Sequence, residues 1–171
     1  AEQVFDPANT LAQTRSRVFS NLNRLFQELG SLNQTTEYAY DSQGNVTSVK
    51  DPLNRTTTNQ YDALNRLKQV TDPALGVTQY AYDGLDALIQ VSDPRNLVTG
   101  YTVNGLGNLT SQTSPDTGNT SRTYDAAGNL VTQTDAKAQA TTYAYDALNR
   151  VTLITFHDGS KQAYAYDSGT N

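Results

Sequence analysis

Aspartate is the chemically active side chain that recurs most regularly in this sequence. Asp41 and Asp51 are ten residues apart, and equivalent aspartates follow along most of the chain. Such carboxylates could bind calcium, which takes roughly six to eight oxygen ligands from one short loop. Here the two aspartates fall at opposite ends of an expected strand, and capping of turns by their side chains explains both positions. We therefore predict no metal site and no cofactor.

Catalytic arrangements are also poorly supported. Paired carboxylates could hydrolyse glycosides, but carboxylates repeated at fixed turns follow from the repetition itself. His157 is the only histidine, lies in the expected turn Phe156–Gly159, and has no partner for a triad. The Gly105-Leu106-Gly107 segment is too short for a phosphate-binding loop and precedes no helix. We predict that the chain is not an enzyme and has no catalytic or cofactor-binding residues.

Tyrosine accounts for 11 of the aromatic residues, beside four phenylalanines and no tryptophan. Rows of tyrosine rings could stack on sugar rings, so a glycan is a possible partner. Packing of tyrosines from one repeat to the next is the favoured interpretation of the same rows.

Charge and composition exclude several other partners. The formal net charge of the 171 residues is −5, and the Lys and Arg residues are scattered singly. The sequence therefore predicts neither nucleic-acid binding nor attraction to an anionic membrane surface. No apolar run reaches the roughly 18 residues that a membrane helix needs, so no membrane insertion is expected. The chain has no cysteine, and residues 1–17 lack the apolar segment of a signal peptide.

Tandem repeats organise the chain, because the dipeptide Tyr-Asp recurs with a spacing of 21 residues. Phe19-Ser20 and Val103-Asn104 fill two slots where the dipeptide is degenerate. The register runs from residue 19 to residue 166 without insertion, which gives seven whole repeats and the start of an eighth. The signature residues are Tyr40, Asp41, Tyr61, Asp62, Tyr82, Asp83, Tyr124, Asp125, Tyr145, Asp146, Tyr166 and Asp167.

Each repeat predicts two strands and two turns. We number positions within a repeat from the aromatic residue as position zero. Residues 36–40 and 46–50 are rich in strand-forming residues, whereas residues 41–45 and 51–55 carry the Asp, Gly, Asn and Pro typical of turns. The predicted fold is all-β: tandem 21-residue β-hairpin repeats that form a long, curved, open antiparallel sheet strip. A parallel β-helix has the same period, but proline in the second turn disfavours it.

Two details stay open at this level. Apolar residues at positions six and nine break strict alternation, so either a bulge interrupts the second strand or position six packs against the turn. Residues 1–18 are interpreted as a degenerate leading repeat, in which a three-residue insertion displaces Asp6-Pro7, and residues 19–171 as the regular array. The unpaired ends of such a strip predict a monomer or weak end-to-end association.

The residues resemble the YD-repeat family, also called Rhs repeats. The stretches 38–46 and 143–151 match its motif closely. The family includes bacterial Rhs polymorphic toxins, encapsulating components of Tc toxins and the animal teneurins. The resemblance implies a partial Rhs shell, in which the strip spirals around a toxin. It further implies a non-catalytic scaffold in a larger secreted or cell-surface protein, with the rest of that protein and its toxin cargo as partners.

The repeat at 103–123 is predicted to be the least regular. It has Val103-Asn104 in place of Tyr-Asp, and its second turn begins with Ser114 instead of aspartate. The stability of a linear array is a sum over its repeats, so an irregular repeat lowers stability locally. Val103→Tyr with Asn104→Asp should therefore stabilise the chain by about 0.5–1.5 kcal/mol.

Overall fold

The computed structural model describes residues 2–5, 7, 11–30 and 34–166, and in these residues the regular structure consists of β-strands. The strands are β1 (Glu2–Phe5), β2 (Leu11–Phe19), β3 (Leu25–Leu29), β4 (Thr35–Tyr40), β5 (Val46–Lys50), β6 (Thr56–Tyr61), β7 (Leu67–Thr71), β8 (Val77–Tyr82), β9 (Leu88–Ser92), β10 (Val98–Val103), β11 (Leu109–Thr113), β12 (Thr120–Tyr124), β13 (Leu130–Thr134), β14 (Ala140–Tyr145), β15 (Val151–Thr155) and β16 (Lys161–Ala163). In the described part of the chain there is no helix of the length and apolarity needed to cross a membrane.

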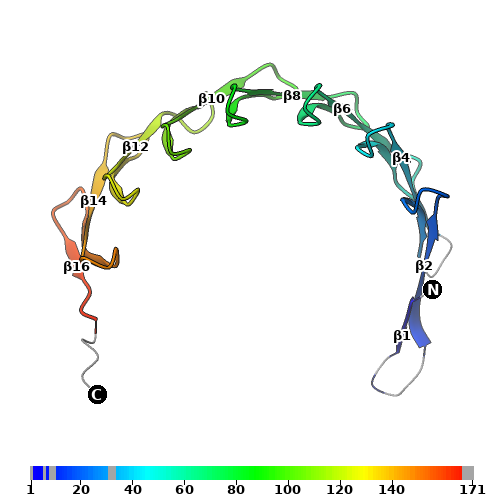
Figure 1. The fold of residues 1–171 in the computed structure, drawn as a ribbon, viewed down its shortest axis with the longest axis horizontal. Helices are drawn as coiled ribbons and strands as arrows, with labels where there is room; N and C mark the ends of the chain where they lie inside the picture. The colour runs from blue at the N-terminus through cyan, green and yellow to red at the C-terminus, as the bar shows by residue number, and fades with distance from the viewer. Residues whose placement is uncertain (1, 6, 8–10, 31–33, 167–171) are drawn as a thin grey trace. The chain divides into compact units, whose positions relative to one another are not determined.

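The chain forms two compact units. The first comprises residues 1–80 with 93–95, and the second comprises residues 81–92 with 96–171. Within each unit the strands pair with their neighbours in chain order, and every pairing is antiparallel (Figure 1). The predicted all-β architecture of tandem hairpins is therefore confirmed, and the parallel β-helix is excluded.

A β-bulge in the second strand of six repeats settles the first open detail. In the pair β4–β5, Tyr40 lies opposite Val46 but Ala39 lies opposite Ser48, so Thr47 is an extra residue. The same shift at position seven recurs in the hairpins headed by Phe19, Tyr61, Val103, Tyr124 and Tyr145. The bulge brings positions six and nine to the same face of the sheet, which explains why the apolar residues lie three apart.

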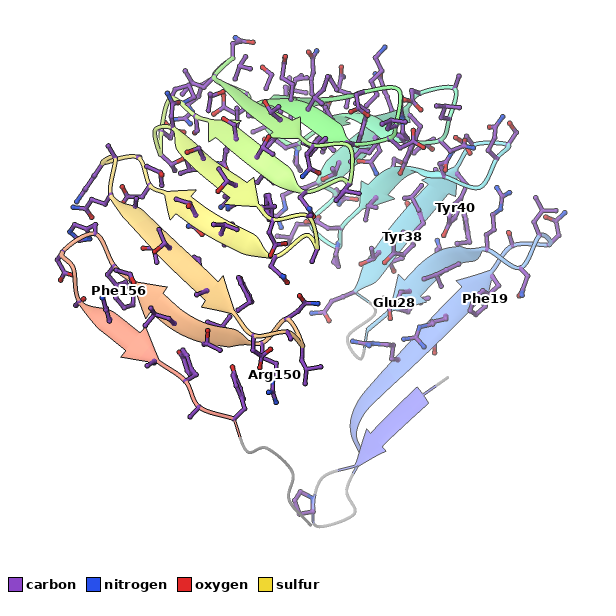
Figure 2. The ribbon with its side chains drawn as sticks, turned by 60° about the vertical axis from the view of Figure 1, so that its left-hand side comes forward. Phe19, Glu28, Tyr38, Tyr40, Arg150 and Phe156 are labelled. Carbon is purple, nitrogen blue, oxygen red and sulfur yellow. The ribbon has the colours of Figure 1, made fainter. Side chains whose placement is uncertain are left out.

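The sheet has two chemically different faces. On β4, Tyr38 and Tyr40 lie on one face of the sheet (Figure 2). Their cross-strand partners Val49 and Val46 lie on the same face. The opposite face carries small and polar side chains such as Ala39. None of the described residues is fully buried, since no second layer covers the sheet in either unit. The apolar face therefore stabilises each unit through contacts between neighbouring strands rather than through a closed core.

The leading hairpin differs from the expected one. Phe5 pairs with Leu11 and Val4 with Gln13, which is the same bulged register that the later hairpins have at positions zero and six. Phe5, and not Asp6-Pro7, thus marks the repeat geometry, so the proposed three-residue insertion is wrong; Asp6 itself lies outside the described residues. The nine-residue β2 has no second turn and serves both hairpins. The boundary at residue 19 stays a prediction.

Candidate functional site formed by the Tyr-Asp signature

The aspartate of the signature closes the first turn of each repeat through its side chain. Oδ1 of Asp62 accepts hydrogen bonds from the amides of Leu64 at 2.9 Å and Arg66 at 3.0 Å. The main chain closes the same turn, with the Asp62 amide donating to the Arg66 carbonyl and the Asn65 amide donating to the Asp62 carbonyl, both at 3.0 Å. Asn65 adopts a φ of 62°, a conformation that asparagine and glycine tolerate best. Equivalent side-chain bonds occur at Asp41, Asp83, Asp125 and Asp146.

The second carboxylate oxygen is held by the residue at position five. Nε of Arg66 donates to Oδ2 of Asp62 at 2.7 Å, and Nδ2 of Asn45 donates to Oδ2 of Asp41 at 2.9 Å. Hydrogen bonds lower the pKa of both carboxylates. The main cause is the backbone amide of Arg66 at Asp62 and the side-chain amide of Asn45 at Asp41. Both oxygens thus serve the turn. Among the described residues, no group of three or more His, Cys, Asp or Glu side chains gathers around a common point.

Second turns repeat this chemistry at the opposite edge of the sheet. Oδ1 of Asp51 accepts the amides of Leu53 and Arg55 at 2.9 and 3.0 Å, and Oδ1 of Asp135 accepts those of Lys137 and Gln139 at 2.8 and 2.9 Å. The fourth residue again has positive φ, even where it is Ala138 at 60°. The capping role expected for the repeated aspartates is therefore what the structure shows at both turns.

In five repeats the hydroxyl of the signature tyrosine forms a hydrogen bond to the preceding repeat. The hydroxyl of Tyr40 donates to the carbonyl of Leu25 at 2.8 Å, and that of Tyr61 donates to the carbonyl of Val46 at 3.0 Å. The acceptor in each case is position six of the preceding repeat, next to the bulge. Since a bulge interrupts the regular ladder, the hydroxyl supplies a bond between repeats at that point. The same tie occurs from Tyr124 to Leu109, Tyr145 to Leu130 and Tyr166 to Val151.

Side chains at position five also link successive first turns. Nδ2 of Asn45 donates to Oδ1 of Asn65 at 2.8 Å, and Asn129 bonds Asn149 in the same way at the same distance. Where position five is arginine, the guanidinium of Arg150, labelled in Figure 2, lies 4.4 Å from the ring centre of Tyr166. This arrangement is a cation–π contact.

The structure also places the other residues singled out in the sequence. His157 is exposed in the turn before β16, and Gly105 to Gly107 form the first turn between β10 and β11. Tyr82 ends β8, and Asp167 lies outside the described residues. Position 104 keeps the turn geometry with asparagine in place of aspartate.

A row of exposed leucines was not anticipated from the sequence. Position three is leucine in most repeats, and these side chains stand at the tips of the first turns. Their exposed fractions are 68% for Leu22, 65% for Leu64, 82% for Leu85, 70% for Leu106 and 72% for Leu148. Their shared position in the repeat is the signal that could have identified them.

Comparison with known proteins supports the interpretation of the signature. The family model described as "Teneurin YD-shell" matches residues 11–171. No curated protein sequence matches the chain. The crystal structure of TcdB2-TccC3-Cdc42 is similar to this chain with a TM-score of 0.73 and 17% identity, over 92% of this chain and 10% of that one. The Photorhabdus luminescens Tc holotoxin pore is similar with a TM-score of 0.72 and 16% identity, over 86% of this chain and 9% of that one.

These structural likenesses show a shared fold, and the chain spans about a tenth of the length of the structures it matches. The family model, in contrast, covers nearly the whole sequence, including every described tyrosine and aspartate of the signature. The bulged hairpin, the aspartate-closed turns and the tyrosine ties are the local structure of that repeat. The chain belongs to the teneurin YD-shell family.

Proposed function

We propose that this chain is a non-catalytic structural segment, one part of the wall of a larger YD-repeat protein that encloses a toxin segment of the same polypeptide. The observation that carries the proposal is the use of the signature side chains. Both oxygens of Asp62 and Asp146 bind groups of their own turns, and the hydroxyl of Tyr145 bonds the preceding repeat. The repeated groups thus build the sheet and extend it.

The exposed leucines support contact with other parts of the parent protein. Leu85, Leu106 and Leu148 belong to the second unit and are 70–82% exposed at the tips of first turns. Successive repeats are about 10 Å apart, since each contributes two strands. A row with this pitch fits a partner with the same pitch, which favours another stretch of YD repeats in the parent chain.

Enclosure is tested in the full-length gene product, produced by a secreting host, by digesting the intact protein with a protease. We expect the segment enclosed by the repeats to be protected from cleavage. The triple variant Leu85→Ser, Leu106→Ser, Leu148→Ser should lose that protection. A matched control is Gln43→Ser with Ala127→Ser, which changes position three where it is not leucine.

The isolated 171-residue chain separates a contact role from a folding role. Because the three leucines are exposed, the triple variant should keep the thermal midpoint of the isolated chain. A parent protein whose following segment is cleaved as fast as a free peptide would refute enclosure. The same proposal places the parent protein outside the cell or on its surface, which fractionation of the producing cells tests.

A glycan-binding role is the second candidate, and one depression favours it. A hollow of about 420 Å³ at the first repeats is lined by Leu22, Phe26, Tyr38 and Tyr40 beside Arg24. However, the Tyr40 hydroxyl already bonds Leu25, and the Arg24 guanidinium lies 5.7 Å from its ring centre. Binding on a glycan array that disappears in Phe26→Ala would support this candidate over the scaffold alone.

A further inference from the structure

Asn104-Gly105 is the only Asn-Gly dipeptide in the sequence. It opens the first turn of the repeat headed by Val103, at the position where most other repeats have aspartate. Asparagine followed by glycine is the pair whose side-chain amide is most readily attacked by the next backbone nitrogen, because glycine has no Cβ to hinder the approach.

Within this turn the side-chain carbonyl of Asn104 is hydrogen-bonded, whereas the amide of Gly105 is not. Oδ1 of Asn104 accepts hydrogen bonds from the amides of Leu106 at 2.9 Å and Asn108 at 3.0 Å, which polarise the side-chain carbonyl. The Gly105 amide, in contrast, makes no hydrogen bond to any of the described residues. Gly105 is exposed, and apart from Gly105 itself and its two chain neighbours no described residue has an atom within 4 Å of the place where a Cβ would stand. The Gly105 nitrogen is therefore free of hydrogen bonds to the described residues, while the side-chain carbonyl of Asn104 that it would attack is polarised.

We propose that Asn104 is a self-modification site, which this turn converts to aspartate. The Gly105 nitrogen forms a bond to Cγ of Asn104 and gives up its proton to water. The negative charge that develops on Oδ1 is stabilised by the amides of Leu106 and Asn108, as in an oxyanion hole. The bond from Cγ to Nδ2 breaks, and ammonia leaves with the proton. Water then adds to Cγ of the cyclic imide and breaks its new bond to nitrogen. The net change consumes one water and releases one ammonia, without oxidation or reduction.

The folded turn also selects the product. Water attacking the main-chain carbonyl would instead give isoaspartate, whose main chain is one carbon longer. That extra carbon would displace the bond from the Asn104 amide to the Asn108 carbonyl, which is 2.9 Å long. An aspartate at this place receives the same pair of amides that holds Asp62, so the carboxylate suits the turn.

Peptide mapping by mass spectrometry tests the proposal on the full 171-residue chain, incubated in mildly alkaline buffer at body temperature. We expect the peptide containing position 104 to gain the mass of an amide-to-acid change about tenfold faster than peptides containing Asn65 or Asn149. Aspartate should exceed isoaspartate, as measured by chromatography against the two synthetic peptides. Gly105→Ala should slow the conversion about tenfold, because a Cβ hinders the nitrogen.

A second measurement compares the conversion rate of Asn104 in the folded and unfolded chain. The same chain is incubated in concentrated urea, where the turn is absent. The proposal expects folded protein to convert at least as fast as unfolded protein, and with less isoaspartate. Conversion that is faster in urea would mean that the turn protects Asn104, and this result would overturn the inference. Equal amounts of the two products in folded and unfolded chains would overturn the selection of aspartate.

Discussion

The repeats headed by Tyr40 and by Val103 share one backbone plan but differ in how they are attached. Both have the bulge at position seven, and both close the first turn through Oδ1 of the side chain at position one. Tyr40 also bonds the carbonyl of Leu25, whereas Val103 has no hydroxyl to offer the preceding repeat. Asparagine can therefore replace the signature aspartate within a turn, whereas the tyrosine joins one repeat to the preceding one.

The second turns differ more strongly. After β5, three residue pairs join to β6, ending at Lys50 and Thr56. After β11, only two pairs join to β12, and the amide of Gly118 bonds the carbonyl of Ser114 in a wider loop. Two polar atoms on β12, Oγ1 of Thr120 and Nη1 of Arg122, are buried without a hydrogen-bond partner. The second turn of the repeat 103–123 is therefore irregular, while its first turn is regular. That this repeat is the least regular of the array stays a prediction.

The largest expected effect comes from removing the tyrosine hydrogen bond between repeats in a regular repeat. Tyr145→Ala loses the bond to Leu130 and much of the contact made by the ring, so we expect the free energy of unfolding to fall by about 2–3 kcal/mol. Val103→Ala removes two methyl groups and should cost about 1 kcal/mol. Urea denaturation followed by circular dichroism measures both. Tyr145→Phe isolates the hydroxyl, at about 1 kcal/mol. Equal losses for the two alanine variants would contradict the distinction between the repeats.

Adding such a hydrogen bond to the repeat headed by Val103 should instead raise the free energy of unfolding. Val103→Tyr places a hydroxyl where it can donate to the carbonyl of Leu88, the residue at position six of the preceding repeat. We expect a gain of about 0.5–1.5 kcal/mol in unfolding free energy, measured by the same denaturation. Val103→Phe adds the ring without the donor and should gain less. If both variants lower the midpoint, the surroundings are fitted to valine and a ring overpacks them.

Turn strain distinguishes two neighbouring second turns. The residue with positive φ is Gly118, the fifth residue of one turn, and Ala138, the fourth residue of the next, with φ of 77° and 60°. Alanine is disfavoured in that conformation, so Ala138→Gly should raise the free energy of unfolding by roughly 0.5–1 kcal/mol. Ala127→Gly is the matched control, because Ala127 is a turn residue without positive φ, and it should lower stability slightly. A gain in both variants would mean that strain at residue 138 is not the cause.

The smallest expected effect concerns pH, because the side chain of Asp62 can ionise whereas that of Asn104 cannot. Because the pKa of Asp62 is lowered in the fold, its ionised form adds stability above the unfolded pKa of about 3.9. That contribution disappears as the pH falls through the lower folded pKa. We expect the thermal midpoint to be level near neutral pH and to drop below about pH 4. Asp62→Asn with Asp146→Asn should reduce the drop. A midpoint that rises on acidification would show that these carboxylates oppose folding.

The hairpins and turns could be predicted from the sequence because their causes are local. Asp62 and Asn65 stand within one turn, and the recurrence of such residues every 21 positions fixes where strands begin and end. The acceptor of the Tyr61 hydroxyl is Val46, fifteen residues earlier, and only the bulge brings the two together. No residue type marks the bulge itself, since position seven is Thr47 in one repeat and Phe26 in another.

The leading hairpin shows the same limit. Its aromatic residue, Phe5, precedes Phe19 by 14 residues, so the period gives no reason to align the two. The sequence therefore favours an alignment on Asp6-Pro7, because Asp and Pro are typical turn residues. Only the pairing of Phe5 with Leu11 reveals that β2 omits a turn and takes part in two hairpins.

The lack of any fully buried residue in the described part of the chain has a calorimetric consequence. Unfolding a globular domain raises the heat capacity by about 12–15 cal/mol/K per residue, chiefly because apolar surface becomes hydrated. In this sheet much of that surface is hydrated already, so the increment per residue must be smaller. A smaller increment flattens the curve of stability against temperature. The protein should therefore keep a nearly constant stability between cold and warm surroundings, and melt over a broad range.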